Sequence, residues 1–194
     1  MTANKNSLDF NFRVMMYFED LHATEDLLAF ITRSQLHCET ILVTLLKKRV
    51  KRPSALKFDR LDCSGALDLC YALGYISTPL KNGLKQLNDF RKQIAQNIEY
   101  VISDRDQEKF MDTIRSACGL KAEYYLSKDT EFPKGIRKAI SLLLMDLSLH
   151  LAESGDQRTE MFMELARFIA HSSGLPAVEF IARAELDLPE LITG

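Results

Sequence analysis

Apolar residues recur along most of this chain at intervals of three and four positions, which places them on one face of an α-helix. Alternation of the kind that indicates strands is scarce. The pattern predicts an all-α fold, an antiparallel bundle of about six or seven helices. We expect the first four helices over residues 8–21, 25–50, 60–74 and 78–98, and further helices beginning near residues 103, 133 and 156.

Residues suited to helix ends mark several of these boundaries. Thr24 and Thr78 are the expected N-caps, and Pro79 then takes the first helical position. Ser103 and Asp106 resemble a capping box. The segment 120–132 is the expected boundary between a helical core, residues 1–119, and C-terminal helices, residues 120–194, which pack on that core in one compact domain.

Each predicted helix has an apolar face that we expect to point into the core. In the fourth helix an arginine, Arg91, stands in that face where a leucine is expected. The inward positions are Leu28, Ile31, Gln35, Cys38, Leu42 and Leu45 in the second helix, Leu61, Ala66, Leu69, Cys70 and Leu73 in the third, Leu84, Leu87, Arg91, Ile94 and Ile98 in the fourth, Phe110, Met111, Ile114 and Cys118 in the fifth, and Ile136, Ile140, Leu143, Leu147 and Leu151 in the sixth.

The overall composition excludes few classes of function. The net charge of −2 gives no general attraction to nucleic acid or to a membrane surface. The four cysteines form no CxxC pair and have apolar neighbours, as in "ALDLCYALG", so we expect buried, reduced thiols. We find neither a signal-peptide pattern nor an uninterrupted apolar run of membrane-spanning length, and we expect a cytoplasmic protein without membrane contact.

Common enzyme motifs have little support in the sequence. No two of the four histidines lie three or four residues apart, so no helix face offers a pair of metal ligands, and we expect neither a metal nor a cofactor. We find no glycine-rich phosphate loop and no nucleophile elbow. These observations lower the expectation of an enzyme.

One cluster of basic residues ends the second predicted helix. Cations suit the negative C-terminal end of a helix, and they also form a candidate surface for nucleic acid or another acidic partner. The cluster consists of Lys47, Lys48, Arg49, Lys51 and Arg52.

Arg91 raises a different question, because burying an unpaired guanidinium is costly. Its head group could reach water, could pair with a carboxylate of another helix, or could face a cleft or a second subunit. Asn88 lies one turn before it, and Gln96 and Asn97 follow within two turns. A polar group therefore interrupts an otherwise apolar face.

The stretch "LDCSGALDLCYALGYISTPLKNGLKQLNDFRKQIAQN" contains an apolar helix ending in "ALGYI", a short turn and a helix that carries Arg91 and closes on polar residues. Together with the preceding "CETILVTLLKKR", it resembles the bacterial mannitol operon repressor (MltR-like) family and, more broadly, HEPN-type helical domains. The resemblance covers about residues 25–100 and implies the same all-helical core.

Some HEPN domains are ribonucleases in which an arginine and a histidine a few residues later meet across a dimer. Arg91 matches that arginine, but Gln96 and Asn97 stand where the histidine is expected, and an amide does not titrate near neutral pH. Glu39 matches the acidic residue that such domains often place beside the arginine, and it is a plausible partner for Arg91.

The resemblance implies a non-catalytic regulatory or interaction module, a homodimer formed through the Arg91 helix, with a protein or RNA partner. A first alternative is a divergent, metal-independent HEPN ribonuclease of a toxin–antitoxin or phage-defence system, using Arg91 with Asn97, Glu39 or His37. A second alternative is a transcription regulator that contacts DNA through residues 47–52, with DNA the less expected partner.

Overall fold

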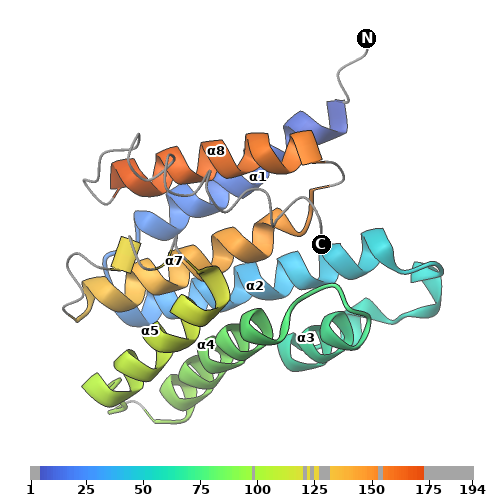
Figure 1. The fold of residues 1–194 in the computed structure, drawn as a ribbon. Coiled ribbons are helices and arrows are strands. Elements are labelled where there is room, and N and C mark those ends of the chain that lie inside the picture. Colours follow the sequence, from blue (N-terminus) through green and yellow to red (C-terminus); the bar gives the residue numbers. More distant parts are fainter. Residues whose placement is uncertain are drawn as a thin grey trace.

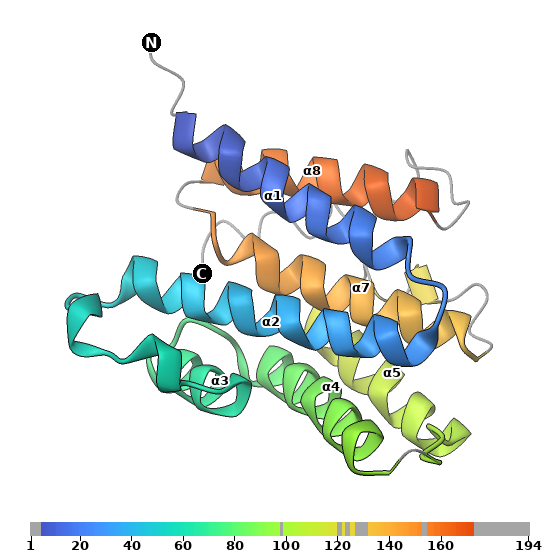
Figure 2. The ribbon, with the colours of Figure 1, turned by 180° about the vertical axis from the view of Figure 1, so that it is seen from behind.

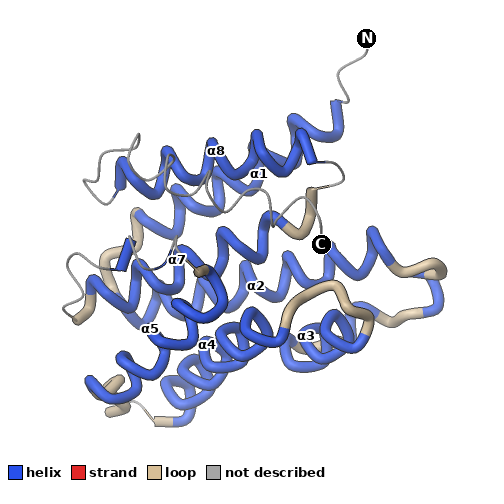
Figure 3. The backbone as a smooth tube through the Cα atoms, in the orientation of Figure 1, coloured by secondary structure: helices blue, strands red, loops and turns tan. Residues whose placement is uncertain are grey.

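The computed structural model describes residues 5–97, 99–119, 122, 125, 126, 132–152 and 155–172, and for residues 5–13 it describes the backbone alone. The described residues contain no strand, and helices make up most of them (Figure 3). The predicted all-α bundle is confirmed. The helices are α1 (Lys5–His22), α2 (Leu27–Arg49), α3 (Cys63–Ala72), α4 (Thr78–Gln96), α5 (Asp104–Cys118), α7 (Lys134–Leu149) and α8 (Gly155–Ser172), with short 3-10 helices η1 (Pro53–Ala55) and η2 (Phe58–Arg60) between α2 and α3.

The helices stack in three layers (Figures 1 and 2). α1 and α8 pack against each other on one side, α2 and α7 form the middle layer, and α3, α4 and α5 form the other side. α7 contacts α2, α4, α5 and α8, so it connects all three layers. Within the described part of the chain, none of the helices combines the length and the apolar character needed to cross a membrane.

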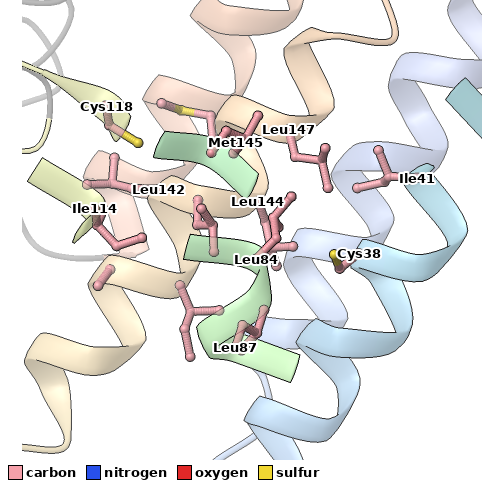
Figure 4. Packing of buried hydrophobic residues seen from close by; sticks show 14 of the residues in the cluster. Cys38, Ile41, Leu84, Leu87, Ile114, Cys118, Leu142, Leu144, Met145 and Leu147 are labelled. Atoms are coloured by element: carbon pink, nitrogen blue, oxygen red, sulfur yellow. The ribbon is translucent and has the colours of Figure 1, made fainter. Parts of the chain in front are cut away.

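α7 forms the centre of the core. Thirteen of its 16 residues are buried, which means that its side chains pack on almost every side rather than on one face. Figure 4 shows Leu142 and Met145 beside α5, and Leu147 on the side facing Ile41 of α2. The inward positions predicted for this helix are all buried, but the sequence pattern did not show that its other faces are buried too.

Two N-caps differ from the prediction. Asp26, rather than Thr24, caps α2, because its carboxylate accepts a 2.6 Å hydrogen bond from the backbone N–H of Ala29. The Thr24 hydroxyl instead donates to the carbonyl of Asp20 at 3.1 Å. A charged acceptor makes the stronger bond with an unpaired N–H at a helix start.

At the start of α4, Ser77 is the N-cap and Thr78 is already helical, so Pro79 occupies the second helical position. The Thr78 hydroxyl lies 3.2 Å from the hydroxyl of Tyr71 on α3, so it bonds to that residue rather than to the backbone at the start of α4. The capping box of α5 is confirmed in part. The Ser103 hydroxyl accepts from the N–H of Asp106 at 3.2 Å, but it also donates to the Asp106 carboxylate at 2.6 Å instead of leaving that carboxylate to reach back to the Ser103 backbone.

Two apolar positions predicted for the core are exposed. Leu28 is 40% exposed because the buried face of α2 passes through Ile31, and Leu27 rather than Leu28 packs against the core. Leu73 is 45% exposed because α3 ends at Ala72, and Leu67 is buried in its place. All four cysteines are buried thiols outside any disulfide, as predicted. Ile98 and most of the segment 120–132 lie outside the described residues.

Candidate functional site

Arg91 lies on the outer side of α4, exposed to solvent. The buried face of α4 continues from Leu87 to Phe90, whose ring packs at 5.4 Å between centroids on Phe110 of α5. The prediction that Arg91 stands in the apolar face is therefore wrong, since one further residue turns its side chain outward. Within the described part of the chain it makes no hydrogen bond or ion pair, so its charge carries no burial cost.

None of the described hydrogen bonds or ion pairs joins Glu39, Gln96 or Asn97 of the predicted RNA-cleaving set to Arg91. The Glu39 carboxylate accepts a 3.4 Å hydrogen bond from Gln35, one turn earlier on α2, and forms no ion pair with Arg91. Gln96 is exposed at the last position of α4. Asn97 caps the helix end and accepts from the N–H of Glu99 at 3.1 Å.

A polar cluster does lie between α3 and α4, but around different residues. Asn88, which is 5% exposed, donates a 3.0 Å hydrogen bond to the Ser64 hydroxyl at the start of α3. Lys92, one turn later on α4, donates to the same hydroxyl at 3.3 Å. The polar interruption predicted around Asn88 is therefore present, and its partner is Ser64 rather than Arg91.

Next to Ser64, two thiols lie in the α2–α3 contact. Cys38 of α2 and Cys63 of α3 are 1% and 3% exposed, and each shifts the pKa of the other. Cys63 is also the first residue of α3, directly after its N-cap Asp62, where the helix dipole favours negative charge.

These contacts separate the acidities of the cysteines. The Cys38 thiol lowers the pKa of Cys63, Gln35 acts in the same direction, and burial and the carboxylates of Glu39 and Asp62 oppose them. The Cys63 thiol, together with burial, raises the pKa of Cys38. Burial raises the pKa of Cys70 to about 12. Cys63 is therefore the most acidic thiol of these three.

The end of α2 and the following turns form a basic surface, which we define as the exposed cations of residues 47–60. This segment holds seven of the chain's 25 basic residues and one of its 27 acidic residues. It carries a charge of +6, while the rest of the chain carries −8 and the whole −2. The basic surface consists of Lys47, Lys48, Arg49, Lys51, Arg52, Lys57 and Arg60, all exposed.

Aromatic rings support part of the basic surface. Lys47 Nζ lies 5.4 Å from the centroid of the Phe58 ring, and the Arg49 guanidinium lies 5.6 Å from that of Tyr75. Arg49 also donates a 2.7 Å hydrogen bond to the carbonyl of His150, which joins the end of α2 to the end of α7. Arg49 is therefore an anchor of the fold as well as a member of the surface.

Sequence reasoning found five of these seven cations and missed Lys57 and Arg60. It placed the end of the cluster at Pro53, where the helical pattern stops. The 3-10 turns η1 and η2 continue the basic segment, and the Lys47–Phe58 contact folds η2 back onto the end of α2. A charge count extended into the loop would have included both residues.

A second polar region, between the start of α4 and α5, has a different charge pattern. It is an open groove of about 600 Å³. Its wall on α5 alternates Arg105 and Lys109 with Glu108 and Asp112. Balanced charges of this kind give no preference for a polyanion over a polycation.

His22 and His37 are partly buried and pack against neighbouring helices. His22 Nε2 lies 3.2 Å from the Ser141 hydroxyl, and burial, with a smaller contribution from the Arg137 charge, lowers its pKa. Burial also lowers the pKa of His37, whose ring packs 4.5 Å from that of Tyr17. Among the residues that the structure describes, no group of three or more histidine, cysteine or carboxylate side chains is placed to hold a metal ion.

Comparisons of this chain with protein-family models, with curated proteins and with solved structures found no match. The resemblance of residues 25–100 to MltR-like and HEPN-type proteins therefore stays a prediction.

Proposed function

We propose that this chain is a non-catalytic helical interaction module that binds nucleic acid through its basic surface. The observation that supports the proposal is the segregation of charge, since residues 47–60 carry +6 on a chain whose remaining residues carry −8. A polyanion is the partner that such a surface attracts most strongly.

Helix-end electrostatics account for only a small part of this charge. The C-terminus of a helix is equivalent to about half a negative charge. Six net positive charges exceed what α2 needs by about an order of magnitude. Lys51, Arg52 and Lys57 are exposed beyond the last turn of α2, where the dipole has largely faded and a partner's phosphates can approach.

Regulation and dimerisation complete the proposal. The outer side of α4 presents Arg91 to solvent, and this side is the surface through which we expect a second copy to bind. Two copies would double the number of basic surfaces on one particle and raise the affinity for a long nucleic acid by linking two binding events. Determination of the mass in solution tests this part, and a strict monomer would remove it.

The binding test compares two variants that each lose three exposed cations. Lys51→Ala/Arg52→Ala/Lys57→Ala removes part of the basic surface, and Lys85→Ala/Arg105→Ala/Lys109→Ala removes the same charge from α4 and α5. Fluorescence anisotropy with labelled RNA and DNA across a salt series measures affinity. We expect the basic-surface variant to lose about tenfold or more in affinity and its salt slope to fall by up to about three, because each lost phosphate contact removes roughly one released counterion.

The control variant should bind as the unmodified chain does. Absence of binding by the unmodified chain at low salt would contradict the proposal. Equal weakening by both variants would also contradict it, since that result indicates attraction to net charge rather than to this surface. An acidic protein as the actual partner would appear as binding to polyglutamate that exceeds binding to both nucleic acids.

The ribonuclease alternative has its own assay. Incubation with mixed RNAs should leave them intact, because Gln96 and Asn97 do not titrate near neutral pH. Reproducible cutting that disappears in Arg91→Ala would overturn the non-catalytic proposal and assign Arg91 a role in the reaction.

A further inference from the structure

Two tyrosines lie beside the basic surface, at the end of α3 and in the turn that follows it. Gly74, with a φ of +72°, allows a tight turn in which its N–H bonds to the carbonyl of Tyr71 at 2.9 Å. The turn brings Tyr75 against the end of α2, where its hydroxyl donates a 3.0 Å hydrogen bond to the carbonyl of Arg49. The fold therefore places aromatic rings from another helix next to the cations.

Tyr71 is exposed, and contacts on both its hydroxyl and its ring hold it in place. The side chain is 39% exposed, its hydroxyl lies 3.2 Å from that of Thr78, and Lys81 Nζ lies 4.3 Å from the ring centroid. Lys81 is held in turn by a 2.9 Å ion pair with Asp68. A side chain that is already ordered loses little further freedom when a partner packs on it.

We propose that the basic surface prefers single-stranded nucleic acid to duplex, and that a base of the single strand stacks on Tyr71. This inference rests on the proposed function and names its ligand class. Every base has a π face that can stack on an aromatic side chain, and cations beside the ring attract the phosphates of the same strand. In a duplex those faces are stacked on neighbouring base pairs and cannot reach the ring.

The shape of the basic surface also disfavours the reading of a duplex. Proteins that read duplex sequence usually insert a helix or a two-stranded ribbon into the major groove. Here the cations lie on the last turn of α2 and around η1 and η2, which have three residues each, while α2 packs against α1, α3, α4 and α7. A duplex would therefore gain phosphate contacts alone, and a single strand would gain phosphate contacts and a stacked base.

The first test uses the unmodified chain, so it does not depend on a variant folding. Fluorescence anisotropy at low salt compares labelled oligothymidylate, oligouridylate and a DNA duplex of the same length. We expect both single strands to bind about fivefold or more tighter than the duplex. The stronger of the two single strands then identifies DNA or RNA as the ligand.

The second test changes the ring. Tyr71→Ala should bind the single strands about fivefold or more weakly and leave duplex affinity unchanged, because only the stacked base is lost. Tyr71→Phe keeps the ring without the hydroxyl and should bind as the unmodified chain does. Tyr17→Ala is the matched control, since Tyr17 is 37% exposed on α1, away from the basic surface, and neither affinity should change.

Salt dependence separates stacking from charge. Tyr71→Ala should weaken binding at every salt concentration without changing the salt slope, because a stacked base releases no counterion. Lys51→Ala/Arg52→Ala/Lys57→Ala should lower that slope. Equal loss of single-strand and duplex affinity in Tyr71→Ala would overturn the stacking role.

The outcomes also separate this inference from the proposed function. Equal affinity of the unmodified chain for single strand and duplex, weakened in the triple variant, overturns the preference and leaves nucleic-acid binding in place. Absence of binding to all three probes at low salt overturns both.

Discussion

α7 and the end of α2 touch each other, since Arg49 donates to the carbonyl of His150, yet they use their side chains in opposite ways. α7 buries 13 of its 16 residues and connects the three layers. The end of α2 exposes a run of cations above two aromatic rings. The comparison teaches that packing and charge are segregated in this chain, so stability and binding should respond to different substitutions.

The largest effect should come from α7. Leu143→Ala removes a fully buried side chain, and we expect the free energy of unfolding to fall by about 2–5 kcal/mol, because the lost contacts leave a cavity. Leu36→Ala, at a position that is 53% exposed on α2, should change it by less than about 0.5 kcal/mol. Denaturant titration measures both, and nucleic-acid affinity should stay unchanged. A loss of nucleic-acid affinity in folded Leu143→Ala protein would contradict the separation of packing from binding.

Gly83 of α4 sharpens this prediction, because it lies against Leu143. A Cβ added there would lie 2.8 Å from Leu143 Cδ1 and 3.1 Å from Ile114 Cδ1. Gly83→Ala alone should therefore destabilise by about 1–3 kcal/mol through overpacking. In the Leu143→Ala background the new methyl group enters vacated space, and the double variant should be more stable than the sum of the single effects. Strict additivity would contradict this packing.

An effect of intermediate size should appear in the pH dependence of the free energy of unfolding. Burial holds the pKa of His22 below its ordinary value of 6.5, so the unfolded chain binds more protons than the folded chain below that pH. The contribution of His22 is fully present above about pH 6.5 and is lost as pH falls through the folded pKa. His37 has the same sign, for the same main cause.

Titration of the unfolding free energy between about pH 7.5 and 5.5 checks this sign. His22→Gln should flatten part of the decline, and His171→Gln, at an exposed position of α8, should leave the profile unchanged. Stability that rises as pH falls through this window would contradict the assignment of His22 to the interior.

The sequence predicted those features that depend on nearby residues. The face of α5 through Phe110 and Ile114 is buried as its spacing indicated, and Ser103 caps that helix. The observed N-cap of α2 lies two residues after the predicted one, and that of α4 lies one residue before it. Neighbouring residues compete for the same N–H groups, and only the folded backbone decides between them.

Features that depend on distant residues were not predictable from spacing. The burial of 13 of the 16 residues of α7 requires four other helices, and the influence of Cys63 on the pKa of Cys38 requires α3 to fold back on α2. For Arg91 a single residue decided the outcome. The spacing from Leu87 allowed an inward position at 90 or 91, and Phe90 takes it because its ring packs on Phe110.

The smallest effect should come from Arg91 itself. Its exposed side chain has no hydrogen bond or ion pair within the described part of the chain, so Arg91→Ala should change the free energy of unfolding by less than about 0.5 kcal/mol. Lys92→Ala, its neighbour, removes a hydrogen bond to Ser64 and should cost more. In the dimer proposed above, Arg91→Ala should in addition lower the mass in solution at concentrations where the chain associates, and an unchanged mass would remove Arg91 from the subunit contact. A lower mass would make the guanidinium a second place where charge, rather than packing, determines what this chain binds.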